Sequence, residues 1–355
     1  GYDRASLEGQ NVGVFGGIMN SDASILLHED KSGNVYSASG ATYSAAVGRV
    51  SFVFGLRGPC ASFDTACSSS LVALQSAVRS LQCGDCDTAL VMGVNAILIP
   101  EVSLSCAIAA MTSPTGHCHT FDMNADGYCR AEGCGALVLR RVSDAEMHSQ
   151  PIHALVHGVA VKQDGTSASL TAPNGRAQEQ LLQAALRDAQ LTGADVDYIE
   201  AHGTGTALGD PIEMGALATV MGEDRDEDRP LVMGAVKANI GHLEPAAGIA
   251  GLIKAILVLQ HEQAPPNPAL KSLNPKIAAV TQDLPVRFPT VLQELRELCG
   301  RDNSDESFGL VAGVSSFGYA GTIAHALLGQ APPKFAKNSP EEEAQRQVCE
   351  EHKTQ

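Results

Sequence analysis

The segment FDTACSSSLVALQ, Phe63 to Gln75, places one cysteine between a predicted strand and a predicted helix. Before it, GPCASFDTA is a short extended run that opens at Gly58-Pro59. After it, apolar residues recur at three- and four-residue spacing, at Leu71, Leu74, Ala77, Val78 and Leu81, as on one face of a helix. Cys67 is therefore predicted in the first turn of a helix, where unpaired backbone N–H groups and the helix dipole favour a thiolate. The alternative is a small, buried structural cysteine at a tight strand–helix junction.

The rest of the chain alternates strand-like and helix-like segments in two series. Strands are expected at 11–17, 58–64, 87–97 and 135–142, and again at 152–161, 196–203, 231–241 and 309–318. Helices are expected at 175–190, 210–221 and 246–260. This alternation predicts an α/β fold with helices layered on sheets. The two series meet near 143–151, which suggests two similar halves.

Two regions fall outside this alternation. The proline-rich segment 264–290 is predicted to be an extended surface connection. From Ala331 onward the chain is charged, contains prolines and has no apolar periodicity. That composition predicts a disordered tail or linker.

The composition limits the class of protein. The chain has 355 residues, is 44% hydrophobic, contains 35 glycines and carries a formal net charge of -16. Such a charge argues against nucleic acid or an anionic membrane as a partner, and the most apolar run, 246–259, is too short to span a bilayer. Ten cysteines in this length do not resemble a disulfide scaffold, so an intracellular, cytoplasmic location is expected.

Three further segments carry an apolar strand into a glycine-rich turn with reactive side chains. His202 lies in EAHGTGTALGD; Lys237, His242 and Glu244 lie in VKANIGHLEPAAG; and VSSFGYAGTIAH is predicted to end a strand in a loop of small residues. Loops beyond the carboxyl ends of strands are where α/β sheets usually bind ligands. A thiol and two imidazoles on such loops predict thiol-based acyl transfer, although a single histidine is more often structural.

Taken together, DTACSSSLVAL, EAHGTGTALGDPIE, NIGHLEPAAGIAGLIK and GVSSFGYAGT resemble the β-ketoacyl synthase domains of type I polyketide and fatty-acid synthases. The resemblance runs from about residue 11 to 328. It implies a thiolase-like fold of five αβαβα layers made of two similar halves, 1–145 with the nucleophile and 146–330 with the two histidines, followed by a tail at 331–355. It also implies a decarboxylative Claisen condensation of an acyl chain with a malonyl-type extender.

The resemblance assigns roles to individual residues. Cys67 matches the nucleophile that accepts the acyl chain, and His202 and His242 match the pair that assists decarboxylation. Lys237 matches a supporting lysine, with Glu244 expected in its ion-pair network. The backbone N–H groups of Cys67 and Tyr319 would form the oxyanion hole.

The resemblance also implies partners. An acyl carrier protein would deliver thioesters on its phosphopantetheine arm, with no cofactor bound by the chain itself. The chain would form a homodimer within a larger multidomain synthase. The family's first strand and following helices have no counterpart here, so the first sheet is expected to lack a strand and expose apolar surface.

Two positions depart from the family pattern. Ile323 stands in GTIAH where asparagine is usual, and it is expected to loosen a loop behind Tyr319. Ala131 stands in YCRAEG where glycine is usual. Asp64, next to the nucleophile segment, is expected to serve the turn or the helix start.

Other interpretations of the same residues remain. Cys83 and Cys86 form a lone Cys-x-x-Cys and HCH at 117–119 is crowded, so no metal site is expected. A thiolase would need a second catalytic cysteine near the C-terminus, and Cys299 lies in a different context. A non-catalytic carrier-binding or dimerisation module is the third interpretation.

Overall fold

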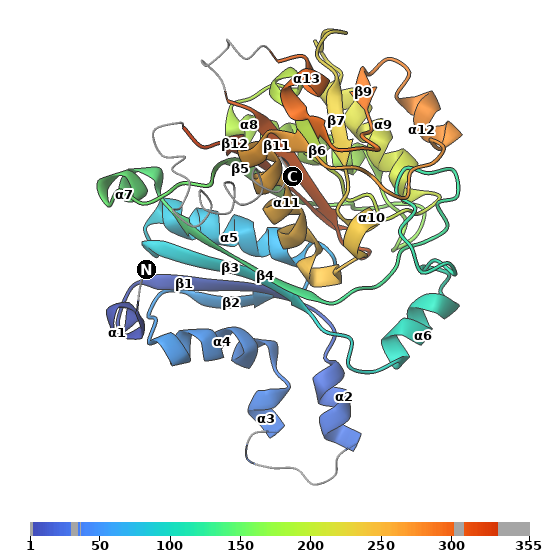
Figure 1. The fold of residues 1–355 in the computed structure, drawn as a ribbon. Helices are drawn as coiled ribbons and strands as arrows, with labels where there is room; N and C mark the ends of the chain where they lie inside the picture. The colour runs from blue at the N-terminus through green and yellow to red at the C-terminus, as the bar shows by residue number, and fades with distance from the viewer. Residues whose placement is uncertain (1–2, 30–34, 36, 302–308, 333–355) are drawn as a thin grey trace, which may run out of the picture.

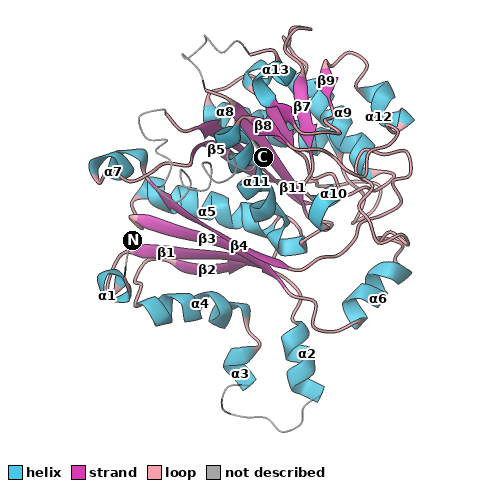
Figure 2. Ribbon diagram, in the orientation of Figure 1, coloured by secondary structure: helices cyan, strands magenta, loops and turns pink. Residues whose placement is uncertain are grey.

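The computed structural model describes residues 3–29, 35, 37–301 and 309–332. Two sheets account for most strands (Figure 2). The first has the order β2-β1-β3-β4 and comprises β1 (Val12–Ile18), β2 (Cys60–Phe63), β3 (Thr88–Asn95) and β4 (Gly133–Arg140). The second has the order β5-β12-β11-β6-β7-β9 and comprises β5 (Ala154–Gln163), β6 (Tyr198–Glu200), β7 (Leu231–Gly234), β9 (Val286–Arg287), β11 (Val311–Phe317) and β12 (Thr322–Gln330).

Four successive strands in each sheet pair in the same sequence of parallel and antiparallel directions, as expected for two similar halves. From β2 to β4 the successive pairings are parallel, parallel and antiparallel. From β7 through β6 and β11 to β12 the same sequence of pairings recurs. The second sheet continues past β12 with the antiparallel strand β5, whereas the first ends at β4 within the described residues.

Helices cover both sheets and separate them (Figure 1). The long ones are α4 (Tyr43–Phe54), α5 (Ser69–Cys83), α8 (Gly175–Ala189), α9 (Gly209–Met221) and α11 (Ala247–His261). Helix α4 contacts β1 and β2, α5 and α11 lie between the sheets, and α8 and α9 cover the far side of the second sheet. The layers therefore follow the expected αβαβα order.

The shorter elements lie around this core. They are α1 (Arg4–Leu7), α2 (Asp22–Glu29), α3 (Ser37–Gly40), α6 (Glu101–Ile108), α7 (Val142–Met147), α10 (Lys237–Ile240), α12 (Pro275–Val280), α13 (Leu295–Cys299), the 3-10 turns Gly193–Asp195 and Glu244–Ala246, and the strand pair β8 (Gln263–Ala264) and β10 (Gln293–Glu294). Each helix in the described part of the chain is too short or too polar to traverse a lipid bilayer.

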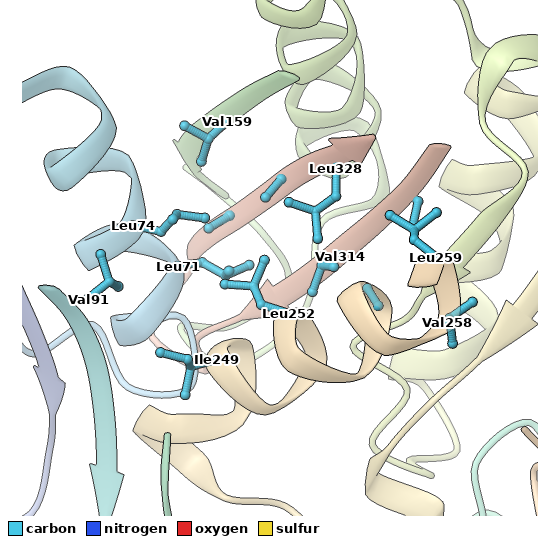
Figure 3. Packing of buried hydrophobic residues seen from close by; sticks show 14 of the residues in the cluster. Leu71, Leu74, Val91, Val159, Ile249, Leu252, Val258, Leu259, Val314 and Leu328 are labelled. Carbon is cyan, nitrogen blue, oxygen red and sulfur yellow. The ribbon is translucent and has the colours of Figure 1, made fainter. Parts of the chain in front are cut away.

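The central layer is apolar because α5 and α11 lie between the two sheets and each packs against strands of both. Figure 3 shows this packing, with side chains from both helices meeting those of the strands at Leu71, Leu74, Val91, Ile249, Leu252, Val314 and Leu328. Both helices begin at the carboxyl ends of the parallel strands. Their packing therefore fixes where the loops at those strand ends meet.

Three segment predictions were wrong. The range 231–241 is not one strand, because β7 ends at Gly234 and α10 follows. The segment 264–290 is not simply an extended surface connection, since it contains α12 and β9 and buries Ile277. TIAH, predicted to lie in a loop, is the beginning of the buried strand β12. The predicted tail falls mostly on 333–355, outside the described residues.

The outer edge of the first sheet exposes apolar side chains, as expected. On β4, Cys134 is exposed and Val138 is 70% exposed, and Val138 pairs in register with Leu90 of β3. The counterpart strand in the other half, β12, is covered by β5 and α8.

This contrast gives a stability prediction. Leu74 is 1% exposed, so Leu74→Ala is expected to lower the free energy of unfolding by about 2–5 kcal/mol through lost burial and a cavity. Val138→Ala removes an exposed side chain and should change the free energy of unfolding by about 0.5 kcal/mol at most. Urea unfolding of both variants measures the difference, and equal losses would contradict the placement of the core.

Candidate active site

Cys67 lies in a sharp turn between β2 and α5. The helix begins at Ser69 with Ser68 as its N-cap, so the predicted position of Cys67 inside the first helical turn is wrong by two residues. Ala66 has a φ of 54°, which is unusual for a residue with a side chain and makes the turn tight. The exposed carboxylate of Asp64 accepts the Ala66 N–H at 3.2 Å, the turn role expected for it.

The three serines after Cys67 are buried and hold this turn in place. Ser68 and Ser69 donate their hydroxyls to carbonyl oxygens of the turn at 2.9 and 2.6 Å. The Ser70 hydroxyl accepts the backbone N–H of Ile249, at the start of α11, at 3.0 Å. The serines therefore fix the nucleophile turn and also tie it to the second half of the molecule.

His242 is the side chain closest to the thiol. Its Nε2 lies 3.0 Å from Cys67 Sγ, and both residues are buried. Its backbone N–H donates to the carbonyl of Cys129 at 2.7 Å, and its Nδ1 accepts the backbone N–H of Glu244 at 3.3 Å. Because Nδ1 is an acceptor, the neutral ring carries its proton on Nε2, facing the sulfur.

His202 follows β6 and faces His242. The ring centroids are 5.6 Å apart with an interplanar angle of 85°. Its Nδ1 accepts the backbone N–H of Phe317, the last residue of β11, at 3.2 Å. Nε2 is therefore protonated here also, and the two rings lie edge to face, each with one N–H group.

The loop that carries His202 is held by carboxylates that the motif analysis missed. Glu213 of α9 accepts the backbone N–H groups of His202 and Gly203 at 2.7 and 2.9 Å. Asp210, in the first turn of α9, accepts those of Gly205 and Thr206 at 3.1 and 3.3 Å. The available signal was an acidic residue, Asp210, in the first turn of a helix that directly follows the His202 loop, with Glu213 about one turn later.

Burial sets the protonation of both imidazoles. It lowers the pKa of His202 and of His242 well below the usual value, and the nearby Lys237 lowers both further. Both rings are therefore neutral near pH 7. Lys237 itself is buried at the start of α10, and burial lowers its pKa while Glu200 and Glu213 oppose that shift.

The expected ion-pair network of Lys237 and Glu244 is wrong. Within the described residues Lys237 forms no ion pair, whereas Glu244 pairs with Arg130. The two distances are 2.6 Å from Arg130 Nε to Oε1 and 2.9 Å from Nη2 to Oε2. Arg130 was not among the predicted site residues, because nothing local in the sequence connects it to a glutamate 114 positions later.

Comparisons with known proteins identify the family of this chain. Residues 1–145 match the family model described as "Beta-ketoacyl synthase, N-terminal domain", and residues 153–271 match "Beta-ketoacyl synthase, C-terminal domain". The chain belongs to the β-ketoacyl synthase family.

Two similar relatives are polyketide synthases much longer than this ketosynthase chain. A phenolphthiocerol/phthiocerol polyketide synthase of Mycobacterium tuberculosis is 43% identical over 336 residues, which are 93% of this chain and 17% of that protein. Polyketide synthase GfsA of Streptomyces halstedii is 42% identical over 345 residues, 96% of this chain and 4% of that protein. The ketosynthase is thus a small part of large multidomain proteins in these relatives.

Solved ketosynthases share the fold. The ketosynthase from module 6 of the bacillaene synthase of Bacillus subtilis superimposes with a TM-score of 0.85 at 34% identity, over 94% of this chain and 56% of that one. The oxazolomycin ketosynthase domain OzmH KS7 of Streptomyces albus gives 0.85 at 35% identity, over 93% and 57%. The thiolase-like fold predicted for this chain is thereby confirmed.

Tyr319 lies in the loop after β11, next to the nucleophile turn of the ketosynthase. Its side chain is 47% exposed. The Ser316 hydroxyl, near the end of β11, donates to the Cys67 carbonyl at 2.7 Å. A side chain on Gly318 would collide with the carbonyl oxygen of Thr65. The two segments expected to supply the oxyanion hole therefore approach each other closely, and the hole itself stays a prediction.

The two departures from the family pattern do not disturb the site. Ile323 is a buried residue of β12, in register with Phe317 and packed in the core beneath α8 and α9. The expected position in a loop is wrong, because the residue lies in a sheet, whereas an effect on the loop of Tyr319 stays a prediction. Ala131 does not have a left-handed backbone, so glycine is not required there, and its N–H donates to the His242 carbonyl at 2.9 Å.

The candidate metal motifs lead to ordinary contacts. His119 Nε2 lies 2.8 Å from the hydroxyl of Thr115, and of the Cys-x-x-Cys pair Cys83 is exposed while Cys86 is buried. No cluster of three or more His, Cys, Asp or Glu side chains suited to a metal ion occurs among the residues that the structure describes.

The pKa of the Cys67 thiol is higher than a position near the start of a helix would by itself predict. Burial raises the pKa of Cys67 to about 12, the charge of Glu244 adds to the rise, and Lys237 opposes it. The expectation of a thiolate stabilised by the helix is therefore wrong for the resting protein. Desolvation outweighs the dipole because the sulfur lies in the interior.

This raised pKa predicts a steep pH dependence. Far below a pKa of about 12, the thiolate fraction rises tenfold per pH unit. The alkylation rate of Cys67 by iodoacetamide should therefore increase about tenfold per unit between pH 6.5 and 9. Peptide mapping by mass spectrometry isolates this site from the exposed Cys60, and a plateau for Cys67 below pH 8.5 would contradict the prediction.

Proposed function

We propose that this chain condenses an acyl group, held on Cys67, with a malonyl-type extender in polyketide synthesis. The observation that carries the proposal is the position of His242 Nε2, 3.0 Å from Cys67 Sγ, with the His202 ring beside it. A thiol can accept an acyl group, and two neutral imidazoles with N–H groups can donate hydrogen bonds to an enolate oxygen.

The first step loads the acyl chain. The Cys67 sulfur attacks the carbonyl carbon of an acyl thioester, a new C–S bond forms, and the bond to the carrier thiol breaks. The proton of the Cys67 thiol ends on the departing carrier thiol, so the exchange of one thioester for another is balanced. The Nε2–H of His242 donates to the sulfur and lowers the cost of its developing negative charge in a buried site.

The second step forms the carbon–carbon bond. The malonyl thioester loses carbon dioxide, and the electron pair of the broken bond becomes an enolate whose oxygen accepts the Nε2–H groups of His202 and His242. The enolate carbon attacks the acyl carbonyl on Cys67, and the sulfur leaves and takes up a proton. The product is a β-ketoacyl thioester two carbons longer. Burial keeps both imidazoles neutral by lowering their pKa values, and the nearby charge of Lys237 lowers them further.

The thioesters would arrive on the phosphopantetheine arm of an acyl carrier protein, so the carrier is the proposed partner. A homodimer, a place within a larger multidomain synthase and a cytoplasmic location complete the proposal. The great length of the polyketide synthases that match this chain supports the multidomain context.

The thiolase alternative gains no support from Cys299. This residue ends α13 and is buried, and it lies near Asp197, which accepts the N–H of Val311 at the beginning of β11. His202 contacts Phe317 at the other end of that strand. The non-catalytic alternative is disfavoured by the assembled Cys67, His202 and His242.

Loading is the first step to test. After incubation with a short acyl thioester, intact-protein mass spectrometry should show one acyl adduct, mapped to Cys67 and absent from Cys67→Ala. Condensation should fall below detection in Cys67→Ala and persist in the control Cys60→Ala, since Cys60 is an exposed residue of β2. An adduct only on other residues, or condensation by Cys67→Ala, would refute the mechanism.

Decarboxylation separates the histidines from the cysteine. Each of His202→Ala and His242→Ala removes one donor aimed at the enolate oxygen, so release of carbon dioxide from a malonyl thioester should slow by about 10²–10³-fold. Cys67→Ala should retain measurable decarboxylation because both donors remain. Equal decarboxylation rates in the histidine variants and in the unaltered protein would contradict the proposed role of the histidines in binding the enolate oxygen.

A further inference from the structure

Arg130 and Glu244 form a deeply buried bidentate ion pair. Their side chains are only 5% and 3% exposed. Two parallel N–H···O bonds fix both distance and angle. Burying two charges costs much of what their attraction returns, so such a pair is weak evidence for added stability and points to a specific geometric role.

The pair joins the two halves of the molecule at the active site. Arg130 precedes β4 in the first half, and Glu244 follows α10 in the second. The Glu244 carboxylate also accepts the side-chain amide of Asn95, at the end of β3, at 3.1 Å. Arg130 in turn donates to the Ser103 hydroxyl at 2.6 Å. Groups of the first half therefore surround a carboxylate that belongs to the second.

Both members of the pair are connected to His242 through the backbone. The residues on either side of Arg130 bond to His242: Cys129 accepts its N–H at 2.7 Å, and Ala131 donates to its carbonyl at 2.9 Å. The N–H of Glu244 points at His242 Nδ1, and Glu244 adopts a left-handed φ of 47° to do so. A residue with a side chain keeps such a conformation only where its surroundings impose it.

From these contacts we propose that Arg130 is a positioning residue, which holds Glu244 in its strained conformation and thereby aims His242 Nε2 at Cys67 across the junction of the two halves. Cys67 belongs to the first half and His242 to the second, so their separation depends on how the halves dock. The ion pair spans that junction two residues from the imidazole. This inference rests on the proposed function of Cys67 and His242.

The chain contains a matched control for the pair. Arg296 and Glu262 form a second bidentate pair, with distances of 2.7 and 3.0 Å. Their side chains are 18% and 32% exposed, and both belong to the second half. Disruption of the Arg296–Glu262 pair removes an ion pair of similar geometry but leaves the junction of the two halves at the active site unchanged.

The test compares Arg130→Lys, Glu244→Gln and the double variant with Arg296→Lys. Arg130→Lys keeps the charge but loses the fork, and Glu244→Gln keeps the shape but loses the charge. Each should lower kcat for condensation by about 10–100-fold with little change in KM, because a small misplacement of a catalytic group has an effect of this size. The double variant should be no worse than the worse single variant. Arg296→Lys should match the unaltered protein.

Two further readouts distinguish positioning from general damage. Far-ultraviolet circular dichroism and thermal unfolding show whether each variant is folded. In folded variants the alkylation rate of Cys67 should change at every pH tested, relative to Arg296→Lys, because the imidazole no longer faces the sulfur. Folded Arg130→Lys and Glu244→Gln with control kcat and control alkylation, or with additive effects, would overturn the inference.

A measurement on the unaltered protein applies even if no variant folds. Nitrogen-15 NMR of labelled histidine should show His242 as the neutral tautomer protonated at Nε2, as the Glu244 N–H requires. The tautomer protonated at Nδ1 would overturn the inference. If the unaltered protein folds but acquires no acyl group, the proposed function fails instead, and the NMR result stands apart from it.

Discussion

The close packing of α5 against α11 is the constraint on which the site depends. Gly248 of α11 lies so near α5 that a Cβ there would come within 2.7 Å of Leu71 Cγ. Only glycine allows this approach. The contact occurs near the first turns of both helices, and those turns directly follow Cys67 in one half and Glu244 in the other. Packing of two core helices thus brings the nucleophile and its imidazole partner together.

The same contact explains the burial of Ser70, the third serine after Cys67. Side chains larger than serine would separate the helix starts, and aliphatic ones would leave the backbone N–H of Ile249 without the Ser70 hydroxyl that now accepts it at 3.0 Å. The Gly17 backbone approaches from the first sheet, where an added Cβ would lie 2.5 Å from the Ser70 nitrogen. Small residues at this junction are a packing requirement as much as a chemical one.

Features encoded locally could be predicted from the sequence. The periods of α8 and α11, and the change from β2 to α5, depend on residues within a few positions of each other. His202 and His242 could be found because each lies in a glycine-rich turn after a strand. Contacts between distant segments could not be found this way, and they account for Arg130 beside Glu244 and for β12, whose small residues resemble a loop until β5 and β11 pair with both its edges.

The position of Cys67 shows how local and global effects compete. A helix start favours a thiolate, and the sequence alone indicates only that effect. The fold adds desolvation, which raises the thiol pKa to about 12 and lowers those of both histidines. The same removal from water strengthens each hydrogen bond to a charge that forms during reaction. The protonated resting thiol and the proposed stabilisation of an enolate therefore follow from the same burial.

The division of the site between halves has a chemical consequence. His202 and His242 both belong to the second half, where β6, β7 and β11 position them, so the proposed donors for an enolate oxygen do not require the turn that carries Cys67. In the proposed mechanism, storage of the acyl group requires Cys67 from the first half. Carbon–carbon bond formation is then the one step that needs both halves, and it needs them at a fixed distance. The Arg130–Glu244 pair lies at that junction, where the proposal expects a small change in docking to alter bond formation more than either half's separate chemistry.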